Sequence, residues 1–241
     1  MPAEPDGKEG GKLLRIVFVR HGEPNYELDC LTETGQAQAA AAAERLVREE
    51  ISEIYSSPFG RARETAAATA ARLDLPVTVL DYMHEITWGG EGIPEDGHPW
   101  TLGCRMIEEG YDFLREDWRK HPWFRGNLVL QEYDRVSSAF DSFLQAQGYR
   151  HEGTRFLCER ENERTVAVFS HGGSGGIVLS HLMNLAFPYV CAALPYDFTS
   201  IIILDFPSQP GKWVFPRLAL FNDCAHFRTG AFHPKIQEKP D

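Results

Sequence analysis

Residues 14–23 of the chain read LRIVFVRHGE, and this stretch decides the fold that we expect. The apolar, β-branched run Ile16–Val19 predicts a fully buried strand. The strand stops at Arg20-His21-Gly22, and open α/β sheets bind their ligands at the carboxyl ends of strands. Arg20 offers a planar fork of donors for a phosphate or carboxylate, and Gly22 permits a sharp turn. His21 beside this cation is expected to stay neutral and nucleophilic near pH 7. A strand end with a solvated basic pair is the simpler interpretation of the same residues.

Helix and strand signals alternate after this first strand. The N-cap residue Thr32 opens an alanine-rich helix that runs to Glu50, and the stretch Ile51–Ser56 alternates like a strand. A second alanine-rich helix is predicted over Phe59–Leu73, followed by a short strand at Val77–Leu80. This βαβ rhythm predicts a three-layer α/β/α sandwich with a mostly parallel central sheet.

The second half of the chain returns to the same pattern. We expect a helix over Leu128–Gly148, a buried strand at Thr165–Phe169, and a helix that begins near Gly173 and continues over Ile177–Leu185. Two further strands, Ser200–Phe206 and Lys212–Leu220, are expected to form a hairpin, and the chain from residue 221 is expected to be loop.

An irregular region interrupts the pattern from about residue 82 to residue 127, with one helix expected around Thr101–Lys120. We interpret residues 88–127 as an insertion that forms a lid or a substrate-selecting cap, although a plain surface excursion has the same composition. The polar residues 1–12 are expected to be a disordered tail. Residues 13–241 are then a single domain that carries this cap.

Composition excludes several classes of protein. Asp and Glu outnumber Lys and Arg by 35 to 24, and the formal charge of −11 argues against non-specific binding of nucleic acid or anionic membranes. No apolar run is long enough to span a bilayer. The five cysteines are scattered and contain no C-x-x-C pair, which favours reduced thiols in a cytoplasmic protein over disulfides or a zinc site.

A second strand end resembles the first. Ser170-His171-Gly172 follows the strand at 165–169, and Arg61 lies in the first turn of the helix after the second strand. In a parallel sheet these carboxyl ends share one edge, so both histidines and both arginines can converge there. Each residue alone is more often structural. Together, in an acidic protein, they predict a binding site for a doubly charged phosphate, to which helix N-termini add backbone N–H groups.

Phosphoryl transfer requires three further features that the sequence can supply. Fixed cations stabilise the charge that develops on the phosphoryl oxygens. A neutral imidazole such as that of His21 can attack phosphorus and hold the group as phosphohistidine. An alkoxide leaving group needs a proton, and Glu85 beside Ile86 and Trp88 is the best placed acid, with Glu91 as the second candidate.

Four motifs together resemble the histidine phosphatase superfamily, which has the phosphoglycerate-mutase-like fold. They are RHGE at 20–23, LTxxGxxQA at 31–39, SSPxxRAxxTA at 56–66 and SHGG at 170–173, in the order typical of that family. The resemblance implies that His21 is the phosphorylated nucleophile and that Glu85 is the proton donor. It also implies a phosphate-binding set, namely Arg20, Arg61, His171, Gly172 and Asn25.

We therefore expect a metal-independent, cofactor-free phosphomonoester hydrolase that acts on a small phosphorylated metabolite. The alternative is a cofactor-dependent phosphotransferase of the phosphoglycerate mutase type, but the segment by which glycolytic mutases grip phosphoglycerate is not recognisable. No aspartate pair, H-E-x-x-H or P-loop indicates a metal or nucleotide site. The substrate and the oligomeric state stay open.

Two other classes compete with this hypothesis. The run Gly172–Gly176 fits the G-x-S-x-G elbow of a serine esterase, in which Ser174 would act with an aspartate and a histidine later in the chain. The candidates for those partners are Asp205 or Asp223 and His226 or His233. The second competitor is a pocket that binds a phosphorylated ligand without turning it over.

Overall fold

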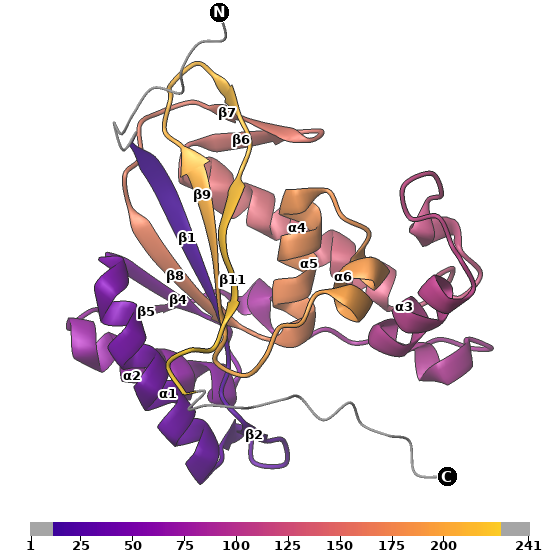
Figure 1. Ribbon diagram of the computed structural model, residues 1–241, viewed down its shortest axis with the longest axis horizontal. Coiled ribbons are helices and arrows are strands. Elements are labelled where there is room, and N and C mark those ends of the chain that lie inside the picture. Colours follow the sequence, from indigo (N-terminus) through magenta and orange to yellow (C-terminus); the bar gives the residue numbers. More distant parts are fainter. Residues whose placement is uncertain (1–11, 228–241) are drawn as a thin grey trace, which may run out of the picture.

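The central feature of the computed structural model, which describes residues 12–227, is a six-stranded sheet in the order β11-β9-β1-β8-β4-β5 (Figure 1). Strands β1, β8, β4 and β5 are parallel, whereas β9 and β11 run antiparallel to their neighbours. The predicted mostly parallel sheet is therefore confirmed. The strand bounds are β1 Leu13–Arg20, β4 Glu53–Ser56, β5 Val77–Val79, β8 Thr165–Ser170, β9 Ile201–Pro207 and β11 Arg217–Asp223.

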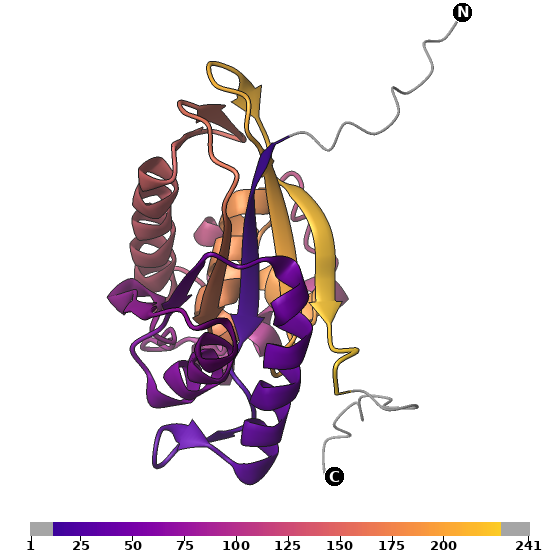
Figure 2. The same ribbon diagram turned by 90° about the vertical axis from the view of Figure 1, so that its left-hand side faces the viewer.

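Helices cover both faces of this sheet, as the α/β/α prediction requires (Figure 2). Helices α1 (Glu33–Leu46) and α2 (Gly60–Leu73) pack on one face, and α4 (Val129–Ala146) and α5 (Gly172–Met183) pack on the other. Thr32 accepts the N–H of Gly35 and caps α1, as expected, but this helix ends at Leu46 rather than at Glu50.

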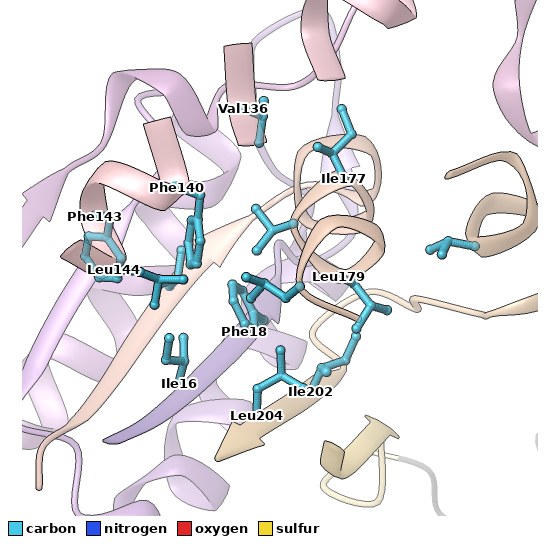
Figure 3. Close-up of a cluster of buried hydrophobic side chains, with 14 of the residues drawn as sticks. Ile16, Phe18, Val136, Phe140, Phe143, Leu144, Ile177, Leu179, Ile202 and Leu204 are labelled. Atoms are coloured by element: carbon cyan, nitrogen blue, oxygen red, sulfur yellow. The ribbon is translucent and has the colours of Figure 1, made fainter. Parts of the chain in front are cut away.

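Strand β1 contributes side chains to the hydrophobic cores on both faces of the sheet, because its side chains alternate between the faces. Ile16 and Phe18 pack with residues of α4 and α5, as Figure 3 shows. Val17 and Val19 point the other way and pack with residues of α1 and α2. The strand is therefore buried on both faces, which explains its unbroken apolar run.

The region of the insertion contains a shorter helix than expected. Helix α3 spans Pro99–Glu108, and the chain leaves it at Gly110, where φ is +77°. Most of residues 111–127 form turns, with a 3₁₀ turn at Trp118–Lys120, so the prediction of a helix to Lys120 was wrong. Helix α3 packs closely on α6 (Phe187–Ala193): a Cβ on Gly103 would lie 2.1 Å from the carbonyl oxygen of Pro188.

Short strands between residues 149 and 214 depart further from the sequence prediction. Strands β6 (Tyr149–Glu152), β7 (Arg155–Cys158) and β10 (Trp213–Val214) form a second sheet in the order β10-β7-β6. Strands β9 and β11 are antiparallel neighbours, as expected, but the intervening β10 leaves the hairpin to pair with β7. Strand β11 also continues to Asp223, so the loop expected from residue 221 begins later.

Other expectations concern the ends of the chain and its covalent state. Cys30, Cys104, Cys158 and Cys191 are free thiols. The expected tail lies outside the described residues except for Lys12, which pairs with Glu161 and Glu163. Of the described helices, none alone has the length and hydropathy to cross a membrane; α5 and α6 meet that criterion only as a pair bent by 118°.

Candidate active site

Strand register brings the sequence motifs together at one sheet edge. In the parallel pair β1 and β8, Arg20 lies opposite Ser170, so His21 and His171 follow side by side. Their ring centroids are 5.1 Å apart. Strand β4 pairs with β8 up to Ser56, which places Ser57 at the same edge. The predicted convergence of the two histidine motifs is therefore present in the structure.

His21 is held as a neutral imidazole with a defined tautomer. Its side chain is buried, and Nδ1 lies 2.7 Å from the carbonyl oxygen of Gly22. Because a carbonyl can only accept, Nδ1 carries the proton and Nε2 keeps its lone pair. The pKa of His21 is lowered to about 3, chiefly by burial and in smaller part by the charges of Arg20 and Arg61. The sequence predicted the neutral form from Arg20, but burial is the larger cause.

Gly22 is required by close packing after His21. Its N–H donates to Thr65 Oγ1 over 3.0 Å, and a Cβ at this position would lie 2.6 Å from the carbonyl oxygen of Gly35. The turn that orients the His21 ring is therefore locked between β1, α1 and α2.

The two arginines are anchored by one side and leave donors unused on the other. Arg20 donates to the carbonyl of Tyr196, and its guanidinium lies 4.4 Å from the centre of the Phe198 ring. Arg61 is 6% exposed and pairs with Asp29. The Nε–H of each arginine is buried without a hydrogen-bond partner among residues 12–227. Buried donors of this kind suit the oxygens of a phosphoryl group.

His171 is the second buried histidine of the candidate site, beside His21, Arg20 and Arg61. Its Nε2 lies 2.7 Å from Ser57 Oγ, and its Nδ1 is buried with no partner in the described part of the chain. Burial lowers its pKa strongly, and the charges around it act in the same direction. His171 is therefore neutral at ordinary pH and can exchange a hydrogen bond with a bound phosphoryl oxygen.

Two positioning residues were missed by the sequence analysis. Ser57 fixes the His171 ring, and it could have been found because it stands inside the 56–66 motif. Asp29 accepts from both Arg61 and the backbone N–H of Gly60, 2.6 Å away. It lies in a loop with no motif, so only the fold shows that it orients Arg61.

Glu85 reaches the same edge from the chain that follows β5. Its Oε1 accepts backbone N–H bonds from Ile86, Gly173 and Ser174 at 3.0, 3.0 and 3.1 Å. The carboxyl group thus caps the N-terminus of α5. Burial raises its pKa, although these N–H groups and Arg20 oppose the shift. A carboxyl group with a raised pKa is suited to donate a proton.

The glycine run after His171 forms the first turn of a helix. Helix α5 begins at Gly172, next to the helix start near Gly173 that the sequence predicted. A Cβ on Gly173 would lie 2.5 Å from Glu85 Oε1 and 2.4 Å from the Ile86 side chain. Glycine is needed here so that the helix end can approach Glu85. A Cβ on Gly172 would lie 3.5 Å from Arg20 Cζ, which places the backbone of Gly172 at the arginine.

The remaining candidates are less central. Glu91 is exposed, whereas Glu85 accepts hydrogen bonds from the N-terminus of α5, so Glu85 is the better placed carboxyl. Asn25 is half-buried, and its Oδ1 accepts from the backbone N–H groups of Glu27 and Leu28 at 3.1 and 3.2 Å. This side-chain oxygen is therefore engaged in a local turn.

The serine esterase arrangement does not form among residues 12–227. Ser174 is fully buried inside α5, and its hydroxyl donates to the Met83 carbonyl over 3.0 Å. The candidate acids are paired elsewhere, Asp205 with Arg15 and Asp223 with Arg45. His226 contacts Thr199 at 3.2 Å, and His233 lies outside the described residues.

A cavity of about 210 Å³ adjoins the phosphate-binding groups. Arg20 and Gly172 line it on one side, and Trp100 of α3 lines it from the insertion. The rest of the wall comes from α5, α6 and the segment up to Asp197. At least one residue of the insertion therefore reaches the candidate site.

Comparison with known proteins agrees with this geometry. The model of the histidine phosphatase superfamily (branch 1) matches residues 16–219. Phosphoserine phosphatase 1 of Hydrogenobacter thermophilus is 34% identical over 168 residues, which cover 66% of this chain and 71% of that protein. The 2-carboxy-D-arabinitol-1-phosphatase of Triticum aestivum is 24% identical over 87% of this chain, which spans only 40% of that relative.

A solved structure shows the same fold. Phosphoserine phosphatase from Entamoeba histolytica, determined with 3-phosphoglyceric acid, covers 88% of this chain and 98% of its own, with a TM-score of 0.59 and 22% identity. Relatives named as probable phosphoglycerate mutases also match, and they do not support the mutase alternative better than hydrolysis. The reaction class predicted from the sequence, that of a phosphatase, is confirmed. This chain belongs to the histidine phosphatase superfamily, branch 1.

Proposed function

We propose that this protein hydrolyses small phosphomonoesters through a phosphohistidine on His21. One observation carries the proposal: a buried, neutral imidazole with a free Nε2 lies against His171 and within the field of two arginines whose Nε–H groups are buried without a partner among residues 12–227. A nucleophile surrounded by fixed donors is what phosphoryl transfer requires.

The first half-reaction transfers the phosphoryl group to the protein. Nε2 of His21 attacks phosphorus, and the bond between phosphorus and the ester oxygen breaks. Arg20, Arg61 and His171 donate to the phosphoryl oxygens, where negative charge is concentrated. The protonated Glu85 gives its proton to the departing alkoxide, so the alcohol leaves neutral.

The second half-reaction restores the enzyme. Glu85, now ionised, takes a proton from a water molecule as that water attacks phosphorus. The bond between phosphorus and Nε2 breaks, inorganic phosphate forms, and His21 returns to its neutral state. The side chains of this chain supply all the charge and proton transfer in both steps, so the proposal invokes no metal and no cofactor.

The substrate is proposed to be a small phosphorylated metabolite. The cavity beside Arg20 and Gly172 has a volume of about 210 Å³, which suits a small leaving group. Its far wall is apolar, with Leu179, Val190 and Leu194, and Trp100 contributes an aromatic surface. The free thiols suit a reducing compartment, and we propose the cytoplasm as the site of action.

Trapping of the intermediate tests the proposal. The protein is incubated with a ³²P-labelled aryl phosphate, quenched in alkali, and digested for peptide mapping. We expect a label that is stable to base and labile to acid on the peptide that contains His21. The variant His21→Ala should carry no label, whereas the control His121→Ala, changed in the insertion, should be labelled normally. Turnover without a labelled protein, or labelling that survives in His21→Ala, would refute the proposal.

A further inference from the structure

A second cluster of titratable side chains lies far from the candidate active site. It contains Asp141 of α4, His151 of β6 and His181 of α5. His181 is nine residues beyond Gly172 along α5, which corresponds to about 13 Å of helix. Figure 1 shows α4 and α5 side by side, with β6 near one end of α4. The cluster therefore joins three elements at the end of α5 opposite to Glu85.

The tautomer of His151 makes this cluster unusual. Its Nε2 lies 2.9 Å from the carbonyl oxygen of Gly153, which can only accept, so Nε2 carries a hydrogen. In the neutral ring Nδ1 then has a lone pair, yet Nδ1 lies 2.8 Å from Asp141 Oδ1. Two lone pairs at this distance repel each other. A cation must therefore stand between the two atoms, either a proton on His151 or a metal ion.

The second histidine favours a metal ion as the shared cation. Nε2 of His181 lies 2.8 Å from the same Oδ1 of Asp141, and the three donor atoms are all within 4.8 Å of one another. Two imidazole nitrogens and one carboxylate oxygen are a common ligand set for zinc. A ligating histidine usually donates its other N–H to a carbonyl, as His151 does to Gly153.

The surroundings allow a metal ion to enter and then hold its ligands in place. The side chains of His151 and His181 are 10% and 18% exposed, and that of Asp141 is 34% exposed, so the cluster opens to solvent on the carboxylate side. The His151 ring stacks on Phe156 with ring centroids 4.3 Å apart. Its orientation is thus fixed by a carbonyl on one edge and by an aromatic ring on one face.

We propose that Asp141, His151 and His181 form a binding site for a divalent transition metal ion of the zinc type. Tetrahedral coordination at about 2.0–2.1 Å places neighbouring ligand atoms about 3.3 Å apart, so each 2.8 Å contact opens by about 0.5 Å. Any proton shared between His151 and Asp141 leaves to solvent as the metal binds. The ion would tie α4, α5 and the β6–β7 hairpin together, and this role does not depend on the proposed phosphatase reaction.

Zinc binding by the full chain tests the proposal. Metal-free protein, kept reduced with a phosphine, is dialysed against graded Zn²⁺ and its bound metal is measured. The background variant His21→Ala removes competition from the active-site imidazole, and His121→Gln serves as the matched histidine control. We expect one equivalent of zinc at micromolar Zn²⁺ in the wild type and in both of these variants. Asp141→Asn and His181→Gln should each weaken binding at least about 10-fold.

A second measurement guards against loss of folding in the variants. Circular dichroism checks that each variant is folded, and ¹⁵N chemical shifts of the wild-type imidazoles report binding directly. Zinc should shift Nδ1 of His151 and Nε2 of His181 and leave Nε2 of His151 as an N–H nitrogen. Absence of a stoichiometric site, unchanged shifts for these two rings, or equal weakening in His121→Gln would overturn the proposal.

Discussion

Two pairs of histidines lie at opposite ends of helix α5, and their environments are opposite as well. His21 and His171 are buried beside two arginines, and both have a lowered pKa. His151 and His181 are half-buried beside Asp141, which raises the pKa of His151 through a hydrogen bond. The same side chain is thus held neutral at one end, where we propose a nucleophile, and is favoured as a cation at the other, where we propose a metal ligand; burial and the sign of the neighbouring charge decide which form is favoured.

The largest expected effect is on activity, and it should distinguish the pair His21 and His171 from the pair His151 and His181. His21→Ala removes the proposed nucleophile and should lower kcat/KM by about 10⁴-fold or more. His151→Ala, at the other end of α5, should leave kcat/KM within about 2-fold. Both values are measured with p-nitrophenyl phosphate, with circular dichroism as the check on folding. Comparable loss in the two variants would show that the pairs do not differ in function.

Substitution of Arg61 tests whether the proposed active site around the pair His21 and His171, here called the active-site pair, needs planar donors rather than charge alone. Arg61→Ala should lower kcat by about 10²–10³-fold, and Arg61→Lys should recover only part of that loss, because lysine lacks the planar fork. Arg63→Ala is the matched control, since Arg63 is exposed on the same helix. Full activity in Arg61→Lys would mean that a point charge is sufficient.

Glu85 tests whether the N-terminal end of α5 supplies the proton. Glu85→Gln should slow hydrolysis of alkyl phosphates by about 10²–10⁴-fold and that of aryl phosphates much less, because phenolates depart with little protonation. The exposed carboxyl in Glu91→Gln should have no effect on either class. If alkyl and aryl esters slow equally in Glu85→Gln, then this carboxyl is not the acid.

The pKa of His21 predicts how the active-site pair responds to acid. The unfolded chain binds a proton on this histidine below pH 6.5, whereas the folded chain does so only near pH 3. Stability contributed by the neutral His21 is therefore lost as pH falls below 6.5. Chemical unfolding from pH 7 to pH 4 should show a shallower loss of stability in His21→Gln than in the wild type. Parallel curves would contradict burial as the cause of the lowered pKa.

The smallest expected effect has the opposite sign and concerns His151. Because its pKa is raised in the folded state, the stability it contributes is fully present below pH 6.5 and is lost as pH rises through the folded pKa. With metal removed by EDTA, His151→Gln should destabilise the protein more at pH 6 than at pH 9. The contribution is that of a partly exposed pair and should be small. A larger loss at pH 9 would show that the pKa is not raised.

The sequence was sufficient for the active-site pair because local signals and topology agree there. Arg20-His21-Gly22 and Ser170-His171-Gly172 each end a buried strand, and parallel pairing alone brings them together. Asp29 was missed because nothing in its loop predicts contact with Arg61. The helix start near Gly173 was predicted, but the close approach of Glu85 and Ile86 to that glycine was not, because it is a contact of the folded chain alone.

The second histidine pair, His151 and His181, could not be predicted from the sequence. Asp141, His151 and His181 come from two helices and a strand, with no motif spacing between them. The hairpin that carries His151 was itself not predicted, because its strands are only four residues long and alternate weakly. The β6–β7 contact with α4 and α5 is a property of the folded chain alone.

The register between β1 and β8 links chemistry to folding in a direct way. A slip of one residue would turn Phe18 toward the face of Val17 and Val19 and would carry His21 out of line with His171. A molecule paired in the wrong register would thus bury the wrong side chains and lose its proposed nucleophile site in the same event. The specific activity of a preparation therefore reports the fraction of chains in which β1 and β8 are paired in the correct register.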